Sequence, residues 1–531
     1  MPTDCIGFKE TGYFSNLICD YLEEKKELQA FYNRFPKNEN FKAQIEEKKQ
    51  SFPKENRSIL VSSLVEQYKI VKPTKTTLSN IEALKSENTF TIVTGHQLNL
   101  FTGPLYFLYK IISTINLAKQ LKKEYPENDF VPVYWMATED HDFDEINYFN
   151  FKGKKIQWNR EASGAVGELD TNGLEEVFKL LELEFVGGNN ADVLKELFEK
   201  AYLKHNNLAD ATFYLANELF GEYGLVIIDA NKKELKKLFI PILEEELLYK
   251  TSFKEVTKTV EKLSKENYNI QVNPREINLF YLDNGLRERI IETEGEYFVN
   301  ETNIKWSKKE LLEHLYEFPE RFSPNVMMRP LYQEVILPNL CYIGGGGELA
   351  YWLELKSYFE AVNIPFPVLL LRNSALLMTT KQKNKLKNLK ISYSQLFLKK
   401  HTFINKKVRE ISNINIDFDP QKQYLNEQFE ALYKLAEQTD KSFIGAVEAQ
   451  EKKQLKGLDN LEKRLLKAQK IKLADEVSRM TDIKNELFPA ESLQERNTNF
   501  SEFYLEHGGH LIKELIKNLE PLKHSFLIIE M

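Results

Sequence analysis

The sequence predicts an α/β fold built on a parallel sheet, together with a separate helical arm, and three observations support this prediction. Short apolar runs alternate with helical patterns between residues 90 and 371, and this alternation is the signature of an α/β fold. Residues 366–371 are almost wholly apolar, as expected for a strand that helices cover on both faces. Beyond Asp419, apolar residues recur at spacings of three and four, which predicts a coiled coil.

The first strand–helix–strand unit is predicted at residues 90–138. Residues 91–94 and 131–137 have the pattern of buried strands, and residues 105–121 carry apolar side chains at helical spacing between them. Each strand stops at polar residues, Gly95-His96-Gln97 after the first and Glu139-Asp140-His141-Asp142 after the second. Because ligands bind beyond the carboxyl ends of parallel strands, the sequence predicts an active site at this edge of the sheet.

The remaining elements divide the chain into five expected parts. Residues 150–320 are mixed, with strands at 225–228 and 277–282 and helical patterns at 175–205, 208–222, 231–248 and 252–266. A strand at 340–343, four glycines, a helix at 348–359 and the strand at 366–371 follow. We expect N-terminal helices and the first half of the core in 1–160, inserted connecting segments in 161–320, the second half of the core in 321–380, a linker and the helical arm in 381–490, and a C-terminal return to the core in 491–531.

The arm is expected to consist of two long antiparallel helices. Its seam follows heptad spacing through Leu425, Phe429, Leu432, Ala436, Thr439, Phe443 and Ala446. Gly445 and Gly457 favour a hinge near residues 445–457. Pro489 ends the helical pattern because proline lacks an amide donor.

Composition and charge narrow the class of protein. The 531 residues carry a net charge of −7, with 42% hydrophobic and 28% charged residues, so they can fill a large core but offer no general nucleic-acid surface. The three cysteines have no metal-type spacing, which fits free thiols in a reducing cytoplasm. No signal peptide and no stretch of about twenty apolar residues is recognisable. We expect a cytoplasmic protein that binds neither membranes nor nucleic acids.

The segment after the first strand, Thr94-Gly95-His96-Gln97, is suited to contact an anion. Glycine allows a sharp backbone turn, and the helix that follows offers unpaired amides. A histidine at this point can stabilise charge on a phosphate or a carboxylate. The alternative is that the glycine serves only the turn and the histidine only caps the helix.

Residues 139–145 hold five carboxylates and one imidazole in seven positions. Crowded carboxylates repel one another, so they favour a shared proton, a cation or an ammonium group nearby. An amine nucleophile has to lose a proton before it attacks a carbonyl, and Asp140, His141 and Asp142 are candidates to orient it. Two alternatives stay open: a divalent metal bound by Asp140, His141 or Asp142, and an acidic helix start capped by Asp142 or Asp144.

Further polar groups lie at predicted turns. Gly344-Gly345-Gly346-Gly347-Glu348 stands between a strand and a helix, where exposed amides can form an anion-binding nest. The run matches neither the phosphate-loop pattern nor the dinucleotide-binding fingerprint. Arg329 and Arg372 can each clamp a carboxylate or a phosphate, although an ordinary ion pair is the simpler interpretation of either arginine alone. Asn373 and Ser374 continue the polar end of the last strand.

These motifs, in this order, resemble the cysteine-adding enzyme family of bacillithiol biosynthesis. The matching segments are residues 94–97, 100–106, 135–145, 323–330, 342–351, 372–374, 487–489 and 493–497, so the similarity extends over nearly the whole chain. The family usually has a proline inside the glycine run, where this chain has Gly346. The resemblance implies a Rossmann-type parallel sheet core with inserted connecting segments and a long antiparallel coiled-coil arm, assembled as a homodimer through or near the arm.

The reaction that the resemblance implies joins the carboxyl of cysteine to the amine of glucosaminyl malate. Amide formation from a free carboxylate is uphill, so we expect activation by ATP with Mg²⁺. The choice between an acyl-adenylate and an acyl-phosphate stays open, as does any further metal. The candidate catalytic residues are His96, Gln97, Asp140, His141 and Asp142. The candidate substrate- and nucleotide-binding residues are Thr94, Gly95, Thr102, Gly103, Asp144, Arg329, Gly344, Gly345, Gly346, Gly347, Glu348, Arg372, Asn373 and Ser374.

Each candidate group has an expected role. We expect His96 and Gln97 to contact the activating phosphate, and residues 344–347 to support the nucleotide or the sugar. Residues 140–142 are expected to orient the amine and accept its proton.

Two other classes of function stay open. One is a tRNA-charging or tRNA-editing enzyme related to class I aminoacyl-tRNA synthetases. The acidic charge, the missing second histidine of the first signature and the absence of a Lys-Met-Ser-Lys-Ser sequence disfavour it. The other is a non-enzymatic scaffold built on the arm, which would not need His96, Asp140 and Asp142 at strand ends.

Overall fold

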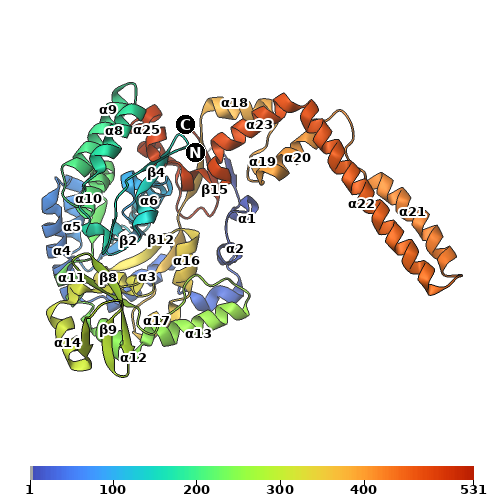
Figure 1. The fold of residues 1–531 in the computed structure, drawn as a ribbon. Helices are drawn as coiled ribbons and strands as arrows, with labels where there is room; N and C mark the ends of the chain where they lie inside the picture. Colours follow the sequence, from blue (N-terminus) through green and yellow to red (C-terminus); the bar gives the residue numbers. More distant parts are fainter. Residues whose placement is uncertain (1–3) are drawn as a thin grey trace. The chain divides into compact units, whose positions relative to one another are not determined.

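The computed structural model describes residues 4–531 and divides them into two compact units (Figure 1). The first unit comprises the chain up to Leu377 together with Leu493–Ile529. The second unit comprises Met378–Ser492 and the last two residues. No helix in the described part of the chain is long and apolar enough to cross a membrane.

Five parallel strands form the central sheet of the first unit. Their order is β13-β12-β2-β3-β6, with the bounds β2 Thr89–His96, β3 Asp129–Met136, β6 Val226–Asp229, β12 Asn339–Gly344 and β13 Val368–Leu371. The chain therefore starts in the middle of the sheet, moves outwards through β3 to β6, and returns to the other side of β2 for β12 and β13. This reversal is the topological switch point of a Rossmann-type fold, and the predicted parallel sheet is confirmed.

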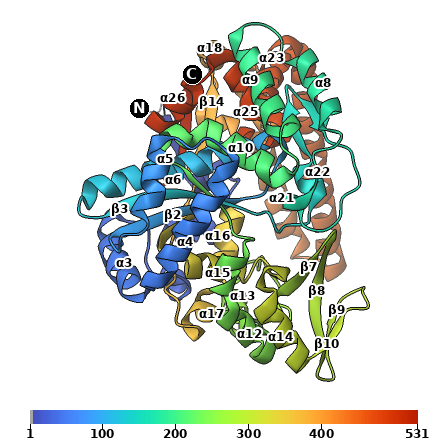
Figure 2. The same ribbon diagram turned by 90° about the vertical axis from the view of Figure 1, so that its left-hand side faces the viewer.

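Helices cover the central sheet, which explains its nearly continuous apolar strands. All eight residues of β2 are buried. Helices α3 (Asn38–Ser51) and α6 (Tyr106–Glu124) share one core cluster with the strands, which includes Phe41, Ile45, Phe90, Ile92, Leu117, Leu121, Ile343 and Leu370. Helices α4 (Lys54–Gln67) and α5 (Lys75–Ala83) contact β6 and β3 and are seen beside the sheet in Figure 2.

A second, antiparallel sheet is inserted between β6 and β12. Its order is β10-β9-β8-β7-β11, with the bounds β7 Leu279–Asp283, β8 Leu286–Thr293, β9 Glu296–Val299, β10 Lys305–Ser307 and β11 Phe322–Pro324. The turn between β7 and β8 is Asn284-Gly285, and Gly285 has a φ of +67°, as expected for a tight hairpin. The predicted strand at 277–282 is therefore one member of a larger inserted sheet.

Other elements complete the first unit. A third sheet has the order β1-β15-β14, with β1 Asp4–Ile6, β14 Ser374–Met378 and β15 Phe526–Glu530, and β4 (Tyr148–Phe151) pairs with β5 (Lys154–Gln157). The helices not yet described are α1 (Phe8–Thr11), α2 (Asn16–Leu22), α7 (Phe143–Ile146), α8 (Leu174–Glu184), α9 (Asn189–Phe198), α10 (Leu208–Phe220), α11 (Lys233–Lys237), α12 (Ile240–Tyr249), α13 (Thr251–Lys265), α14 (Lys308–Glu317), α15 (Arg329–Ile336), α16 (Gly346–Leu353), α17 (Lys356–Ala361), α24 (Gln494–Asn497), α25 (Phe500–His507) and α26 (His510–Asn518).

The second unit is helical, and its two longest helices form the predicted coiled coil. α21 (Asp419–Ala436) packs on α22 (Lys441–Lys472) through Phe429, Ala436 and Val447. The hinge predicted between Gly445 and Gly457 is wrong, because both glycines lie inside α22. The chain reverses at residues 437–440 instead, where the Asp440 side chain accepts a hydrogen bond from the Ser442 amide and caps α22. The other helices of this unit are α18 (Thr380–Asn388), α19 (Tyr393–Leu396), α20 (Lys400–Ile411) and α23 (Ala474–Leu487).

Candidate active site

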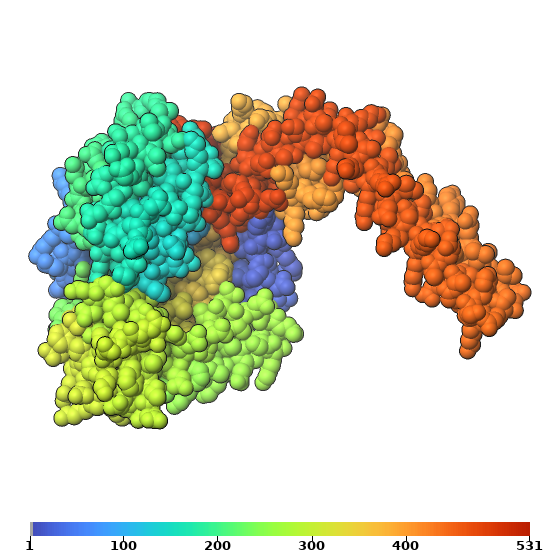
Figure 3. All heavy atoms as spheres, in the orientation of Figure 1, coloured from blue at the N-terminus to red at the C-terminus, as the bar shows by residue number. Residues whose placement is uncertain are grey.

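A pocket of about 710 Å³ opens at the carboxyl ends of β2, β3 and β12, at the switch point of the central sheet. The second sheet contributes Arg287 and Pro324 to its wall, and the start of α16 contributes residues 345–347. Figure 3 shows a hollow between the yellow-green second sheet and the teal inserted residues, with gold atoms of the α16 region at its floor. The position agrees with the general rule for ligand binding in open α/β sheets.

The end of β2 forms the floor of the pocket. The Thr94 hydroxyl donates to the Ile343 carbonyl at 2.7 Å and ties β2 to β12. Gly95 leaves room for its neighbours, because a Cβ at this position would lie 3.2 Å from the Tyr342 hydroxyl. His96 follows, lines the pocket and is only 7% exposed. The absence of a side chain at residue 95 therefore leaves room for the Tyr342 and Arg329 side chains where the pocket begins.

The His96 imidazole is enclosed by aromatic rings and lies near two cations. Its ring centroid is 5.4 Å from that of Tyr106 and 5.0 Å from that of Phe107. Burial, together with Lys110 and Arg372, holds the pKa of His96 well below its usual value. The ring is therefore neutral at pH 7, and its buried Nε2 has no hydrogen-bond partner among the described residues.

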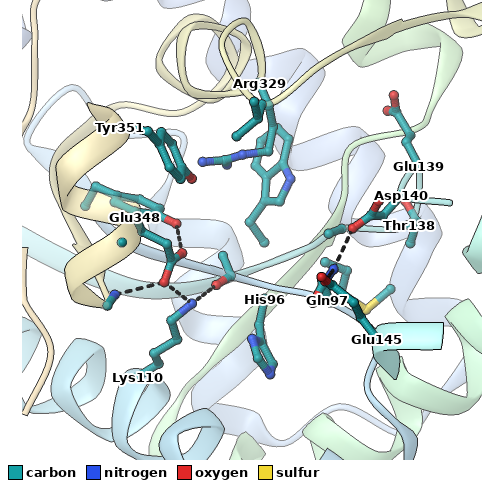
Figure 4. Close-up of a pocket in the computed structure, with 18 of the residues that line it drawn as sticks. His96, Gln97, Lys110, Thr138, Glu139, Asp140, Glu145, Arg329, Glu348 and Tyr351 are labelled. Carbon is teal, nitrogen blue, oxygen red and sulfur yellow. Dashed lines mark hydrogen bonds and ion pairs between the residues drawn. The ribbon is translucent and has the colours of Figure 1, made fainter. Parts of the chain in front are cut away.

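Lys110 and Glu348 form a buried ion pair on one side of the pocket (Figure 4). The Lys110 Nζ lies 2.6 Å from Glu348 Oε2 and donates to the Gly95 carbonyl at 2.6 Å. Glu348 also accepts hydrogen bonds from the Tyr342 hydroxyl and the Gly345 amide. Burial acts to raise the pKa of Glu348, but these donors hold it below its usual value. The Glu348 carboxylate thus already binds the Gly345 amide at the start of α16, where an anionic ligand would otherwise bind.

Four arginines line the pocket, and three of them have a buried N–H group without a partner: Arg287 Nε, Arg329 Nη2 and Arg372 Nε. No other arginine in residues 4–531 has a buried nitrogen without a hydrogen-bond partner. A buried donor that lacks an acceptor costs about 1–3 kcal/mol, so evolution rarely retains one without a use. All three arginines come from different elements and converge on one pocket, which is the donor set expected around an anionic ligand.

The surroundings of Arg329 and Arg372 hold their guanidinium groups in place. The Arg329 guanidinium carbon lies 5.7 Å from the Trp135 ring centroid and 5.5 Å from that of Tyr342, a cation–π arrangement. Arg372 lies 5.1 Å from the Tyr106 ring and pairs with the buried Glu495 at 2.8 Å. Both arginines therefore reach the pocket in fixed orientations.

The opposite side of the pocket presents carboxylates (Figure 4). The Gln97 amide donates one hydrogen bond to Asp140 Oδ2 at 2.8 Å and another to Glu145 Oε2 at 2.9 Å. The His141 amide donates to Asp140 Oδ1 at 2.8 Å. Burial alone would raise the pKa of Asp140, but these hydrogen bonds and the nearby Arg287 hold it well below its usual value. Asp140 is therefore a permanent anion at physiological pH.

Two further ion contacts surround this acidic side. Glu139 lines the pocket and accepts a hydrogen bond at 2.9 Å from Lys236, whose side chain is completely buried. The Arg287 guanidinium lies 3.9 Å from the Phe280 ring centroid and contacts His141 Nδ1 at 2.8 Å. The second sheet thereby closes the pocket over the carboxylates of the central sheet.

The predicted site residues separate into two groups. Gly95, His96, Gln97, Asp140, Arg329, Gly345, Gly346, Gly347, Glu348 and Arg372 line the pocket. Thr94, Thr102, Gly103, His141, Asp142, Asp144, Gly344, Asn373 and Ser374 are not among the lining residues.

Several of the residues outside the pocket have structural contacts. Asp142 and Asp144 are exposed, and Asp142 caps α7 by accepting a hydrogen bond from the Glu145 amide. The carbonyl of Gly103 accepts a hydrogen bond from the Asn499 side chain. Asn373 hydrogen-bonds to Ser113, and Ser374 donates to Glu495. These residues make hydrogen bonds within the protein around the pocket and do not themselves line it.

Some pocket residues were missed by the sequence reasoning. Lys110, Tyr106, Trp135, Glu139, Glu145, Arg287, Tyr342, Tyr351 and Arg496 line the pocket as well. The sequence carries signals for some of them: Lys110 lies inside an otherwise apolar helical stretch, Glu139 and Glu145 belong to the carboxylate cluster at 139–145, and Arg496 lies in the motif at 493–497. The described residues, 4–531, contain no group of three or more His, Cys, Asp or Glu side chains placed to hold a metal ion. The unpartnered arginines do fit the phosphates of ATP.

Two family models match the chain. The description "Bacillithiol biosynthesis BshC, N-terminal Rossmann-like domain" covers residues 1–373, and "Bacillithiol biosynthesis BshC, C-terminal coiled-coil domain" covers residues 375–531. Several similar proteins carry the name "Putative cysteine ligase BshC", among them the three described next. The protein from Christiangramia forsetii is 63% identical over 100% of this chain and 99% of its own length. The protein from Flavobacterium johnsoniae is 60% identical over the full length of both chains.

The third relative, from Bacillus cereus, is 33% identical over 66% of this chain and 67% of its own length. The two models together extend over both structural units, and the first two relatives align from end to end. The chain therefore belongs to the BshC family of bacillithiol biosynthesis.

Proposed function

We propose that this protein is a cysteine ligase that joins the carboxyl of cysteine to the amine of glucosaminyl malate, with activation by ATP. The observation that carries the proposal is the division of one pocket into two halves of opposite character. One half holds the unpartnered N–H donors of Arg329 and Arg372, and the other holds the carboxylates of Asp140 and Glu145 with Arg287 beside them. Ligation of an amine to an activated carboxylate needs both kinds of group within reach of one another.

The arginines support the activation step. Bound ATP supplies the group that converts the cysteine carboxylate into a good acyl donor. Arg329 and Arg372 would hold its phosphates, since guanidinium N–H groups donate charge-assisted hydrogen bonds to phosphate oxygens. Fixed cations also stabilise the charge that develops as the leaving group departs.

The acidic half supports recognition of an ammonium group. Gln97 gives both of its amide hydrogens to carboxylates, so the trio of Gln97, Asp140 and Glu145 presents only acceptors. Such a trio repels a phosphate, which moves Gln97 away from the phosphate-contacting role expected from the sequence. It suits instead the α-ammonium of cysteine, which must remain protonated while the carboxyl reacts.

Asp140 and His96 differ as acceptors of the proton that the amine nucleophile loses. A carboxylate whose pKa lies well below its usual value, like Asp140, is a weak base and holds a bound ammonium in its charged form. The neutral His96 imidazole has an unpartnered Nε2 in the same pocket. Its lowered pKa makes His96 a weak base as well, but the amine nitrogen becomes strongly acidic once the new bond forms, so we assign to the neutral His96 imidazole the proton that this nitrogen then loses.

The direct test is incubation of the purified protein with cysteine, ATP and glucosaminyl malate. Mass spectrometry should detect the condensed thiol, and the nucleotide product, ADP or AMP, identifies the mode of activation. Omission of ATP should abolish the product. A complete mixture that yields no condensed thiol, together with salt-sensitive retention of tRNA on filters, would favour a tRNA-related enzyme instead.

We further propose that the protein is a cytoplasmic homodimer that assembles through the arm. The second unit exposes large apolar side chains on its long helices, among them Tyr424, Leu435, Phe443, Leu461 and Ile471. Exposed apolar groups of this number favour a protein partner. Light scattering on the full-length protein should give twice the mass of 62.2 kDa, and Leu435→Ser combined with Leu461→Ser should reduce it to the mass of one chain.

A further inference from the structure

The short segment of Leu493, Gln494, Glu495 and Arg496 belongs to the first unit and reaches the pocket from the far end of the sequence. It matches one of the motifs that the sequence singles out, yet the proposed function assigns it no role. Arg496 is exposed and lines the pocket. Glu495 is completely buried and does not line the pocket, so any role of its carboxylate has to act through a neighbour.

The Glu495 carboxylate is satisfied by three donors. It accepts hydrogen bonds from Arg372 Nη2 at 2.8 Å, the Ser374 hydroxyl at 3.1 Å and the Ala375 amide at 3.1 Å. Arg372 Nη1 donates to the Asn373 carbonyl at 2.9 Å and to the Ser374 hydroxyl at 3.1 Å. Both terminal nitrogens of Arg372 are thus engaged on the side away from the pocket.

The remaining nitrogen of Arg372 is Nε. Arg372 is 5% exposed, lines the pocket, and its buried Nε has no partner among the described residues. Nε lies 3.9 Å from where a Cβ of Gly345 would stand, beside the start of α16. Tyr106 supports the other face of the guanidinium plane. The contacts of Nη1, Nη2 and the guanidinium plane are thus all within the protein, and only the Nε–H is left without an acceptor.

Attachment of the C-terminal segment does not require the charge at residue 495. The neighbouring Gln494 already binds the chain at Leu377, accepting from its amide at 2.9 Å and donating to its carbonyl at 3.0 Å. A neutral amide therefore fixes the segment to β14. A buried carboxylate is costly to desolvate, and its value at residue 495 lies in the orientation that it gives to Arg372.

We propose that Glu495 is a positioning residue, which rotates Arg372 so that its Nε–H meets an anionic oxygen of a substrate. The inference rests on the proposed function for the identity of the substrates, but not for the geometry. The ligand group is a phosphate of ATP or a carboxylate of cysteine or glucosaminyl malate. Arg496, which also lines the pocket, offers a second cation to the same anion.

The test is a double-mutant cycle of Glu495→Gln and Arg372→Ala, with steady-state kinetics for each of the three substrates. Glu495→Gln should raise the KM of one substrate by about 10- to 100-fold and change kcat little, because a charge-assisted hydrogen bond is lost. The substrate whose KM rises identifies the anion. In the Arg372→Ala background, Glu495→Gln should have less than a twofold further effect.

Glu506→Gln, on the exposed face of α25, is the matched control and should leave all three KM values unchanged. If Glu495→Gln does not fold, Arg372→Lys serves in its place: lysine keeps the charge but lacks the Nε–H, so the same KM should rise. Equal effects of Glu495→Gln with and without Arg372 would overturn the proposal, as would an unchanged KM for every substrate in a folded variant.

A failure of the proposed function can be told apart from a failure of this inference. If the wild type forms no condensed thiol, calorimetric titration with sodium tripolyphosphate and with malate still measures anion binding. The wild type should bind one of these probes at least tenfold more tightly than Glu495→Gln or Arg372→Lys. Equal affinity in all three proteins would refute the positioning role, whatever reaction the pocket performs.

Discussion

Replacing Asp140 by asparagine is expected to impair recognition of cysteine while leaving the fold and the other substrates nearly unaffected. The isosteric amide keeps the volume of the side chain but removes its charge. In the wild type, Gln97 donates to Asp140 Oδ2 at 2.8 Å. In the variant, an NH2 group or a neutral oxygen faces Gln97 instead. The cluster of Gln97, Asp140 and Glu145 thereby loses the negative charge of Asp140, the carboxylate whose pKa is held well below its usual value.

The magnitude follows from the kind of bond that is lost. A hydrogen bond between an ammonium and a carboxylate is worth about 1.5–3 kcal/mol, which corresponds to roughly 10- to 150-fold in affinity. We expect the KM of cysteine to rise by about this factor. The KM values of ATP and glucosaminyl malate should change less than threefold. Asp192→Asn, in an exposed ion pair on α9, is the matched control.

The pH dependence of stability gives a second measurement. Because the pKa of Asp140 is lowered in the folded protein, its charge stabilises the fold above its usual pKa of about 3.9. That stabilisation is lost as the pH falls through the lowered folded value. The difference in free energy of unfolding between wild type and Asp140→Asn should be constant above about pH 5 and shrink below pH 4.

Two results would refute the reasoning about Asp140. One is a KM increase for glucosaminyl malate with that of cysteine unchanged, which would place the other amine at the trio. The other is an equal loss of 3-mercaptopropionate and cysteine turnover, since the former lacks the ammonium group. An ammonium site predicts that only cysteine loses binding energy.

Three further changes test the packing around the site and the arm. Lys110→Met leaves the Glu348 carboxylate, whose side chain is 25% exposed, without its cation. The free energy of unfolding in urea should fall by about 3 kcal/mol, and adding Glu348→Gln should restore part of it. A full loss that persists in the double variant would argue against the ion pair. Gly346→Pro, at the first position of α16, should stabilise by about 0.4–1 kcal/mol relative to Gly346→Ala, and a lower unfolding midpoint would contradict this. Phe429→Ala should cost about 3 kcal/mol in the coiled coil and speed amide exchange in α21; unchanged exchange would show that the seam lies elsewhere.

The local features of the fold were predictable because they depend on neighbours in sequence. The strands β2, β3 and β13 are marked by apolar runs that end at polar residues, and these ends do meet at one sheet edge. The predicted position of the turn in the arm is wrong because the chain reverses before a helix cap, not at a glycine. Gly445 and Gly457 have open space around them and continue α22, whereas Asp440 provides the cap.

The site was less predictable because its members arrive from distant elements. Arg287 lies on β8 of an inserted sheet, and no local pattern places it beside Asp140. Lys110 follows the apolar spacing of α6, so only its burial against Glu348 separates it from a solvated lysine. Asp142 illustrates the reverse case, because its sequence neighbourhood is suggestive while its side chain caps α7 at the surface.

The sheet β1-β15-β14 has a consequence for biosynthesis of the chain. Its central strand is formed by residues 526–530, and its outer strands are formed by residues 4–6 and 374–378. On the ribosome, the N-terminal strand must therefore wait for some five hundred residues to be translated before its partner exists. A chain cut before residue 526 would lack the central strand, and the edges of β1 and β14 would be open to pairing with other chains.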